Sequence, residues 1–297
     1  YWHPGNKFIN PMKLALYMIS NSLEREIIQG GMGFVVSDHR LVREVSTNGG
    51  LGVLSGVGAD MFIIRRLQNG DRDGDIRSAL KEYPNQEFSK LIIDDYYIPG
   101  GREPDKKYKH APKPEVQLNS NDFFSLKNNY LNELIVAANF VEVHLAKRGH
   151  NNPVGINYLY KIRQTIMPSI YGAMLAGVDA VFIGAGIAKH IPDALTALSE
   201  HSSATLPIPI VGDKDQILRF DPGKIFKKKN LKRPVFFGIL SNQMGLKVLP
   251  NADAYVFEGP TAGGHNAPAR SKSLNERGEP DYGVRDEMDY EYLKLWL

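Results

Sequence analysis

The chain has 297 residues, of which 42% are hydrophobic and 23% are charged, and its formal net charge is +3. These fractions are typical of globular proteins, and no apolar run is long enough to cross a bilayer, so we expect no membrane contact. The absence of cysteine excludes disulfides, thiolate metal sites and cysteine nucleophiles, and it is compatible with the cytoplasmic location that we expect.

Short apolar runs alternate with helical patterns along the chain, which is typical of βα units and a parallel sheet. Strands are expected near residues 26–29, 51–54, 153–158, 179–183, 234–240 and 253–257. Ser37 or Asp38 is expected to cap a helix that ends at Asn48 and Gly49. Further helices are expected over residues 130–147, through Ile170 to Leu175 and near 286–297, with an extra hairpin around 207–211.

The regular alternation breaks down between residues 56 and 152, where polar stretches containing glycine and proline dominate. We interpret this span as a largely helical insertion after the second strand of a single domain that covers residues 1–297. Such an insertion either covers a site or forms a subunit interface, so a homo-oligomer is one of two alternatives.

A basic run precedes the fifth predicted strand. We interpret it as a solvated loop rather than a nucleic-acid contact, because short charge runs usually lie on solvated faces. Its members are Lys224, Lys227, Lys228, Lys229, Lys232 and Arg233.

Three glycine-rich segments follow predicted strands, at the sheet edge where α/β proteins bind ligands. They are Gln29-Gly30-Gly31-Met32-Gly33, Gly184-Ala185-Gly186 and Ala262-Gly263-Gly264-His265. Glycine lets backbone approach a planar or anionic ligand, and histidine is suited to proton transfer near neutral pH. Each segment alone is equally well explained as a tight turn, but three at one edge favour a site. Neither the dinucleotide fingerprint nor the phosphate-loop spacing occurs.

On these segments, together with Asn48-Gly49-Gly50-Leu51-Gly52 and residues 179–183, the chain resembles the nitronate monooxygenase family, also called 2-nitropropane dioxygenases. The resemblance runs from about residue 26 to residue 268 outside the insertion, and residues 258–265 are its most specific part. Members of this family are FMN-dependent (β/α)8 barrels. The resemblance therefore implies an α/β fold of the (β/α)8 (TIM) barrel type and FMN as cofactor.

The resemblance also implies a flavin site made of glycine-rich loops and a few side chains. Its cofactor-binding residues are expected to be Gly30, Gly31, Met32, Gly33, Asn157, Gly263 and Gly264. His265 is the implied catalytic residue, which takes the α-proton of a neutral nitroalkane or hydrogen-bonds its nitro group. Lys161 is expected either to hold an anionic group or to lie on the surface. Glu258 is expected either at the site or bonded to a loop backbone.

The implied reaction is FMN-dependent monooxygenation, in which alkyl nitronates (nitroalkanes) and O2 give carbonyl compounds and nitrite. The same Gly-Gly-His element occurs in flavin-dependent enoyl-thioester reductases of the enoyl-ACP type, which form the alternative enzyme class. A barrel that binds an acyl group or a protein partner without catalysis is the third hypothesis. The expected partners are a small-molecule substrate and O2, without nucleic acid, membrane or metal.

Six predicted strands fall short of the eight that close a barrel, and barrels commonly hold phosphate after the seventh and eighth strands. The chain also begins with Tyr1 rather than Met. The first residue indicates a fragment or a processed chain. From the strand count we expect a barrel truncated after the sixth strand, in a natural protein that continues past Leu297, with a non-binding remnant as the alternative.

Other polar residues are interpreted as structural. Asp94 and Asp95 are adjacent and point apart, which disfavours a paired-carboxylate site. His144 and His150 are six residues apart, a spacing that does not place two metal ligands on one helical face. His39 is expected to act near the cap of the first helix.

Overall fold

The computed structural model describes residues 23, 25–33, 36–118, 124–210, 212, 214–259, 269–287, 289 and 291–293. Its main sheet has six parallel strands in the order β1-β2-β5-β6-β9-β10. These are β1 (Ile28–Gln29), β2 (Leu51–Ser55), β5 (Val154–Leu159), β6 (Ala180–Gly184), β9 (Val235–Leu240) and β10 (Ala254–Phe257). All six strands predicted from the sequence are confirmed.

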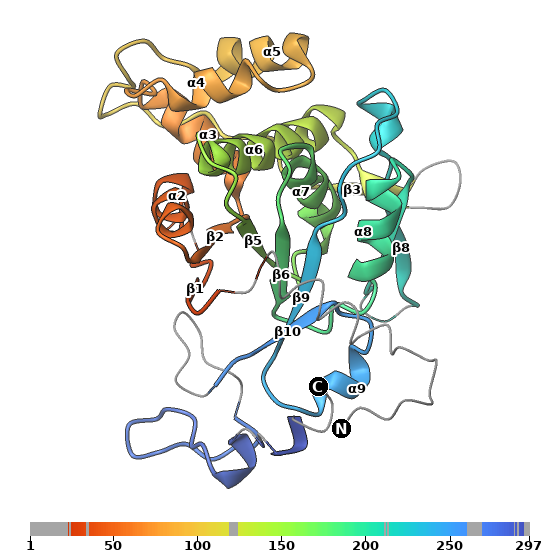
Figure 1. Ribbon diagram of the computed structural model, residues 1–297. Coiled ribbons are helices and arrows are strands. Elements are labelled where there is room, and N and C mark those ends of the chain that lie inside the picture. The colour runs from red at the N-terminus through yellow and green to blue at the C-terminus, as the bar shows by residue number, and fades with distance from the viewer. Residues whose placement is uncertain are drawn as a thin grey trace, which may run out of the picture.

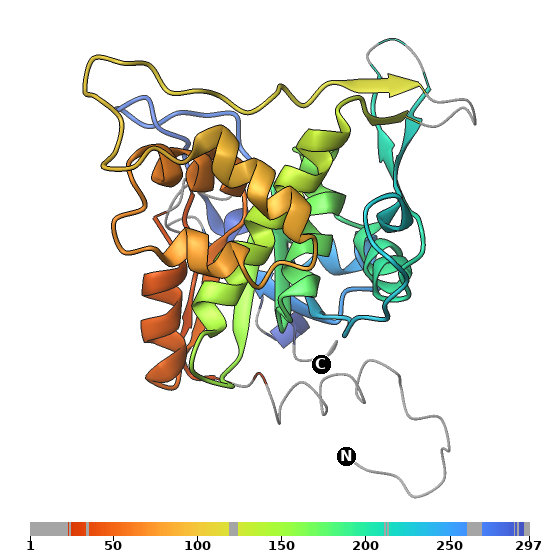
Figure 2. The same cartoon turned by 90° about the horizontal axis from the view of Figure 1, so that it is seen from above.

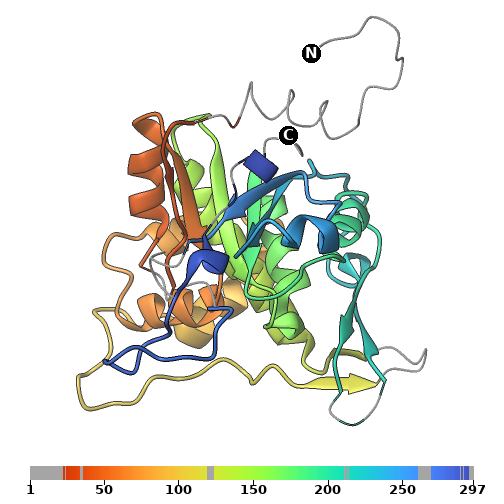
Figure 3. The same ribbon diagram turned by 90° about the horizontal axis from the view of Figure 1, so that it is seen from below.

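The strand order follows the chain without reversal, and the sheet curls into a half-barrel (Figure 1; Figure 3 shows it from below). A doubly wound sheet reverses its strand order at a switch point, whereas a barrel does not. The fold is therefore a barrel-like α/β fold. Because all six strands are parallel, their carboxyl ends lie at one edge of the sheet.

Helices cover the outer face of the sheet, as Figure 2 shows from above. The described helices are α2 (His39–Thr47), α3 (Ala59–Gln68), α4 (Asp75–Leu80), α5 (Gln86–Tyr96), α6 (Asn129–Lys147), α7 (Arg163–Leu175), α8 (Ile191–Ser199) and α9 (Gly245–Val248). Of these, α4 and α5 pack on α3 and α6 rather than on the sheet. Helix α2 begins and ends as predicted, because the Asp38 carboxylate accepts from two backbone N–H groups and Gly49 follows with φ of 88°. None of the described helices is both long and apolar enough to cross a bilayer.

The two faces of the sheet bury different side chains, because successive residues of a strand point to opposite sides. On the outer face, residues such as Leu54, Ile156 and Ile183 pack in the large core beneath the helices. On the inner face, Val53, Phe182 and Phe237 belong to a smaller separate cluster. The site described below lies where this inner face meets the carboxyl edge.

The span 56–152 contains α3, α4, α5 and α6 and two short strands, β3 (Val116–Leu118) and β4 (Phe124–Leu126). Helix α6 packs against α7, where Gly172 lets the backbones approach: a Cβ there would lie 2.1 Å from the carbonyl oxygen of Val136. This helix therefore belongs to the layer that covers the sheet. The interpretation of the whole span as a helical insertion is not confirmed.

A second, four-stranded sheet has the order β3-β4-β8-β7 and contains the extra hairpin that the sequence predicted. The hairpin consists of β7 (Ala204–Ile208) and β8 (Gln216–Phe220), paired antiparallel. Residues 269–287 lie at the opposite end of the molecule from α4 and α5 (Figure 1). Of the helix expected near residues 286–297, residues 291–293 are helical, whereas Asp286 ends a short 3-10 turn and residues 287 and 289 are not helical. The other residues of this span lie outside the described part of the chain.

Candidate functional site at the carboxyl edge of the sheet

The loop of residues 30–33 follows β1 and is held by two side chains. Gln29 spans β1 and β2, because its Oε1 accepts from the backbone N–H of Val53 at 3.3 Å and its Nε2 donates to Ser37 Oγ at 2.8 Å. Ser37 is 1% exposed, and its Oγ also accepts from the backbone N–H of Met32 at 2.9 Å. These bonds fix the backbone of the first glycine-rich segment against the sheet.

Gly31 and Asn157 meet at the centre of this edge. A Cβ built on Gly31 would lie 2.6 Å from Cβ of Asn157 and 2.7 Å from the carbonyl oxygen of Leu54, so only glycine fits. Asn157 Nδ2 donates to the carbonyl oxygen of Gly31 at 3.3 Å. Two of the residues expected to bind the cofactor are therefore in contact, although they are 126 positions apart.

The amide of Asn157 has an unused acceptor. Its Oδ1 is buried and has no hydrogen-bond partner among the described residues. Buried polar atoms are usually paired, so an acceptor without a partner among the described residues is available to a donor from outside them. No described atom lies within 4 Å of a Cβ built on Gly30, so the backbone beside this acceptor is open.

An apolar row continues from Asn157 across the inner face. Asn157 is in register with Phe182 of β6, which is in register with Phe237 of β9. The two rings stack with centroids 4.4 Å apart and planes 15° apart. On the other side of Asn157 the row ends at Ser55 of β2. A polar amide thus lies beside a stack of aromatic rings, an arrangement that suits a flat ligand with one polar edge.

The remaining described candidates surround this centre. Met32 is 36% exposed, which leaves its side chain accessible at the edge. Lys161 is exposed just past the end of β5. The backbone N–H of Glu258 donates to the carbonyl oxygen of Leu240 at 2.8 Å, which continues the pairing of β10 with β9. Gly186 packs on the ring of Tyr160 with φ of 136°, so the second glycine-rich segment forms a turn at the same edge.

Gly263, Gly264 and the catalytic candidate His265 lie outside the described residues. Their roles remain predictions. Glu258 and Gly259 continue from the carboxyl end of β10 toward these residues.

The other histidines predicted as structural are in packed positions. His39 is 4% exposed, and its Nδ1 lies 3.3 Å from Oε2 of Glu142 on α6. His144 stacks on Phe140, and burial, together with the charge of Arg148, lowers its pKa. His150 Nε2 lies 2.7 Å from the carbonyl oxygen of Ala146 near the end of α6. The described residues contain no group of three or more metal-ligating side chains.

Asp95 and two members of the basic run make hydrogen bonds or ion pairs within the described part of the chain. Asp95 accepts from Lys109 Nζ at 2.7 Å and from Tyr130 Oη at 2.8 Å, and these hydrogen bonds lower the pKa of its carboxyl. In the basic run, Lys232 pairs with Asp179 and Arg233 with Asp253. The remaining lysines of this run are exposed, as expected of a solvated loop.

The sequence placed Gln29 in the first glycine-rich segment without assigning it a role, and it did not identify Phe182 or Phe237 as parts of the site. Burial lowers the pKa of His190, which precedes α8, and the charge of Lys189 acts in the same direction. No protein-family model matches the chain, and neither does any curated protein.

Proposed function

We propose that this chain belongs to an FMN-dependent oxidoreductase of the nitronate monooxygenase type, which oxidises alkyl nitronates with O2 to carbonyl compounds and nitrite. The observation that supports this best is the junction of Gly31 and Asn157, with the buried and unpartnered Oδ1 of Asn157 beside it. The isoalloxazine ring of FMN is flat and has both hydrogen-bond donors and acceptors on one edge. The residues present fit such a group.

The side chains in this proposal have separate tasks. The amide of Asn157 binds the polar edge of the ring, and the backbone of residues 30–33 lies against the ring because Gly30 and Gly31 have no side chains. Phe182 and Phe237 form an apolar base at the inner face and exclude water there. When bound, FMN supplies the capacity to take electrons from a nitronate and to pass them to O2.

His265 is proposed as the base for neutral nitroalkanes, on the resemblance of residues 258–265 to the family. A neutral imidazole nitrogen accepts the α-proton, which requires a pKa near or below the working pH. The exposed ammonium of Lys161 is proposed to attract the nitronate anion. The sequential strand order and the curl of the sheet support a (β/α)8 barrel as the complete fold.

Flavin binding is the first test. The chain is purified and titrated with FMN, and flavin fluorescence gives the dissociation constant. We expect binding, and we expect the substitution Asn157→Leu to weaken it at least about tenfold, the loss expected for a polar contact of roughly 1.4 kcal/mol. Absence of FMN binding by the complete protein would contradict the proposal and favour a non-catalytic barrel.

Anaerobic reduction separates the two enzyme hypotheses. We expect propyl-2-nitronate to bleach the flavin absorbance and NADPH to leave it unchanged. Bleaching by NADPH alone would instead favour the enoyl-thioester reductase. The substitution His265→Asn should retain FMN binding and nitronate turnover while losing turnover of the neutral nitroalkane, and unchanged turnover of the neutral form would exclude His265 as the base.

A further inference from the structure

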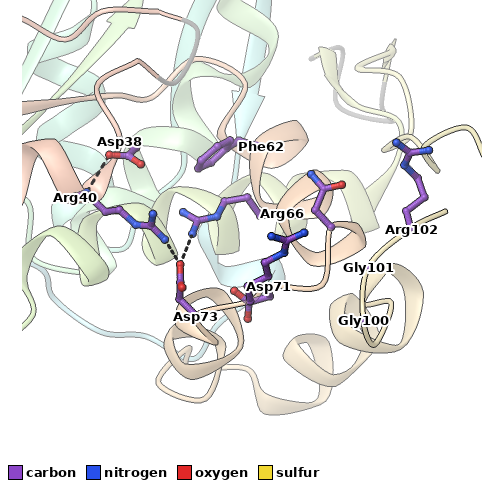
Figure 4. Close-up of a pocket in the computed structure, with 11 residues that line it drawn as sticks. Asp38, Arg40, Phe62, Arg66, Asp71, Asp73, Gly100, Gly101 and Arg102 are labelled. Carbon is purple, nitrogen blue, oxygen red and sulfur yellow. Dashed lines mark hydrogen bonds and ion pairs between the residues drawn. The ribbon is translucent and has the colours of Figure 1, made fainter. Parts of the chain in front are cut away.

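A cavity of about 560 Å3 lies outside the candidate flavin site, between α2, α3 and two loops (Figure 4). Arg40 from α2 and Arg66 from α3 both point toward Asp73 on the first loop, and Phe62 lies beside them. Gly100 and Gly101 of the second loop line the cavity without side chains. Its volume is in the range of small-molecule sites and far larger than one ion needs.

Arg66 lacks the acceptors that a guanidinium normally has. Its side chain is 18% exposed, and within the described part of the chain it makes no hydrogen bond. Its ion-pair partner there is Asp73, with 3.8 Å between Nη2 and Oδ2, and its guanidinium carbon lies 5.5 Å from the centre of the Phe62 ring. A guanidinium has five donors, and none of those of Arg66 is hydrogen-bonded to a described residue.

The Asp73 carboxylate occupies the position of an anion between the two arginines. Its Oδ2 accepts a hydrogen bond from Nη2 of Arg40 and is also the atom nearest to Arg66. Its side chain is 57% exposed, on a loop where Gly70 and Gly74 have positive φ values. An exposed ion pair of this kind contributes about 1 kcal/mol or less, so an external anion can replace the carboxylate at little cost.

The other carboxylates of the lining are engaged elsewhere. Asp71 has a fully buried side chain that accepts from the backbone N–H groups of Ile76 and Arg77 and pairs with Nε of Arg77. Asp38 caps α2. Arg102 donates to the carbonyl oxygens of Glu103 and Pro104, so no described carboxylate pairs with it. Asp75, which does not line the cavity, also lies near Arg40, with 3.8 Å between its Oδ2 and Arg40 Nη2. The lining itself contains four arginines and three aspartates, so it has an excess of positive charge toward an entering ligand.

We propose that this cavity binds a phosphate monoester, with Arg40 and Arg66 holding the phosphate in place of the Asp73 carboxylate. A phosphate dianion has three terminal oxygens, which satisfies both guanidinium groups better than one carboxylate oxygen shared between them. The organic part of the ester lies along Phe62 and the side-chain-free surface of Gly100 and Gly101. This site needs no flavin, so its test is independent of the function proposed above.

Phenyl phosphate and inorganic phosphate are the probes, titrated into the chain at low ionic strength and followed by calorimetry. Phenyl phosphate should bind more tightly than inorganic phosphate because of the contact with Phe62. The substitution Arg66→Gln should weaken phenyl phosphate binding about tenfold or more. Lys228→Gln, which removes an exposed positive charge from the basic run, is the matched control and should leave the affinity unchanged.

Asp73→Asn is the decisive variant, because it removes the competing carboxylate from an exposed position and should strengthen binding severalfold. This increase is opposite to the effect of a folding defect. The site would be excluded if the unmodified chain bound neither probe, or if Arg66→Gln and Lys228→Gln had equal effects. Equal affinity for the two probes would contradict the contact of the organic group with Phe62.

Discussion

Gly31 touches Asn157 so closely that the strand end of β5 and the loop after β1 form one surface, with the Gly31 carbonyl oxygen 3.3 Å from Asn157 Nδ2. The contact joins the first glycine-rich segment to the amide that we propose binds flavin. It also makes the site sensitive to a single added methyl group.

Gly31→Ala is expected to lower the free energy of unfolding by about 1–3 kcal/mol, the usual cost of forcing extra volume into a packed region. The new Cβ would lie 2.6 Å from Cβ of Asn157, so the amide must move. FMN affinity should fall as well. Chemical unfolding and flavin titration measure the two effects. Gly30→Ala is the matched control for stability, since no described atom lies within 4 Å of a Cβ there, and an equal loss of unfolding free energy in both variants would contradict the close contact.

Ser37→Ala tests whether the loop of residues 30–33 depends on its buried hydroxyl. The substitution leaves the Met32 N–H without its acceptor and removes one of the acceptors of Gln29 Nε2, which also donates to the carbonyl oxygens of Gly30 and Val53. The expected cost is about 1–3 kcal/mol in unfolding free energy. Because the loop then loses its anchor, FMN binding should weaken. A fluorescence titration with FMN measures this loss of affinity.

Ser46→Ala is the comparison for this prediction. Ser46 is also buried, and its Oγ donates to the carbonyl oxygen of Pro153 at 2.9 Å and accepts from the N–H of Gly52, at the opposite edge of the sheet. The Ser46→Ala variant should lose a similar amount of unfolding free energy but keep its FMN affinity unchanged. If both serine variants affected FMN binding equally, the anchoring role of Ser37 would be wrong.

The strands were predictable because buried parallel strands are continuous apolar runs, and Ala180–Gly184 and Val235–Leu240 are such runs. The limits of α2 were predictable from Asp38 and Gly49. The packing position of α6 could not be predicted, because 13 of its 19 residues are buried and no polar face indicates which neighbour it packs against.

The contacts that form the site could not be predicted from the sequence either. Gly31 and Asn157 meet only through the register of β2 with β5, which no local pattern specifies. The aromatic stack of Phe182 and Phe237 depends on the register of β6 with β9 in the same way. In the cavity beside α3, Asp73 reaches Arg40 through the shape of a loop with positive φ values, and the arginines come from different helices.

Glu133 on α6 gives a prediction for the pH dependence of stability. Burial raises the pKa of its carboxyl to about 7, and the hydrogen bond from Asn85 Nδ2, at 2.6 Å, opposes this shift. Between pH 4.5 and 7 the folded chain therefore keeps a proton that the unfolded chain has released, so the free energy of unfolding falls as pH rises through this window.

Glu133→Gln keeps an acceptor for Asn85 and removes this titration. It should stabilise the chain by roughly 1 kcal/mol at pH 8, after allowance for partial exposure, and by almost nothing at pH 4. Urea unfolding at both pH values measures the difference, with the exposed Glu44→Gln as control, and a gain of the same size at pH 4 and pH 8 would show that Glu133 is not the titrating group.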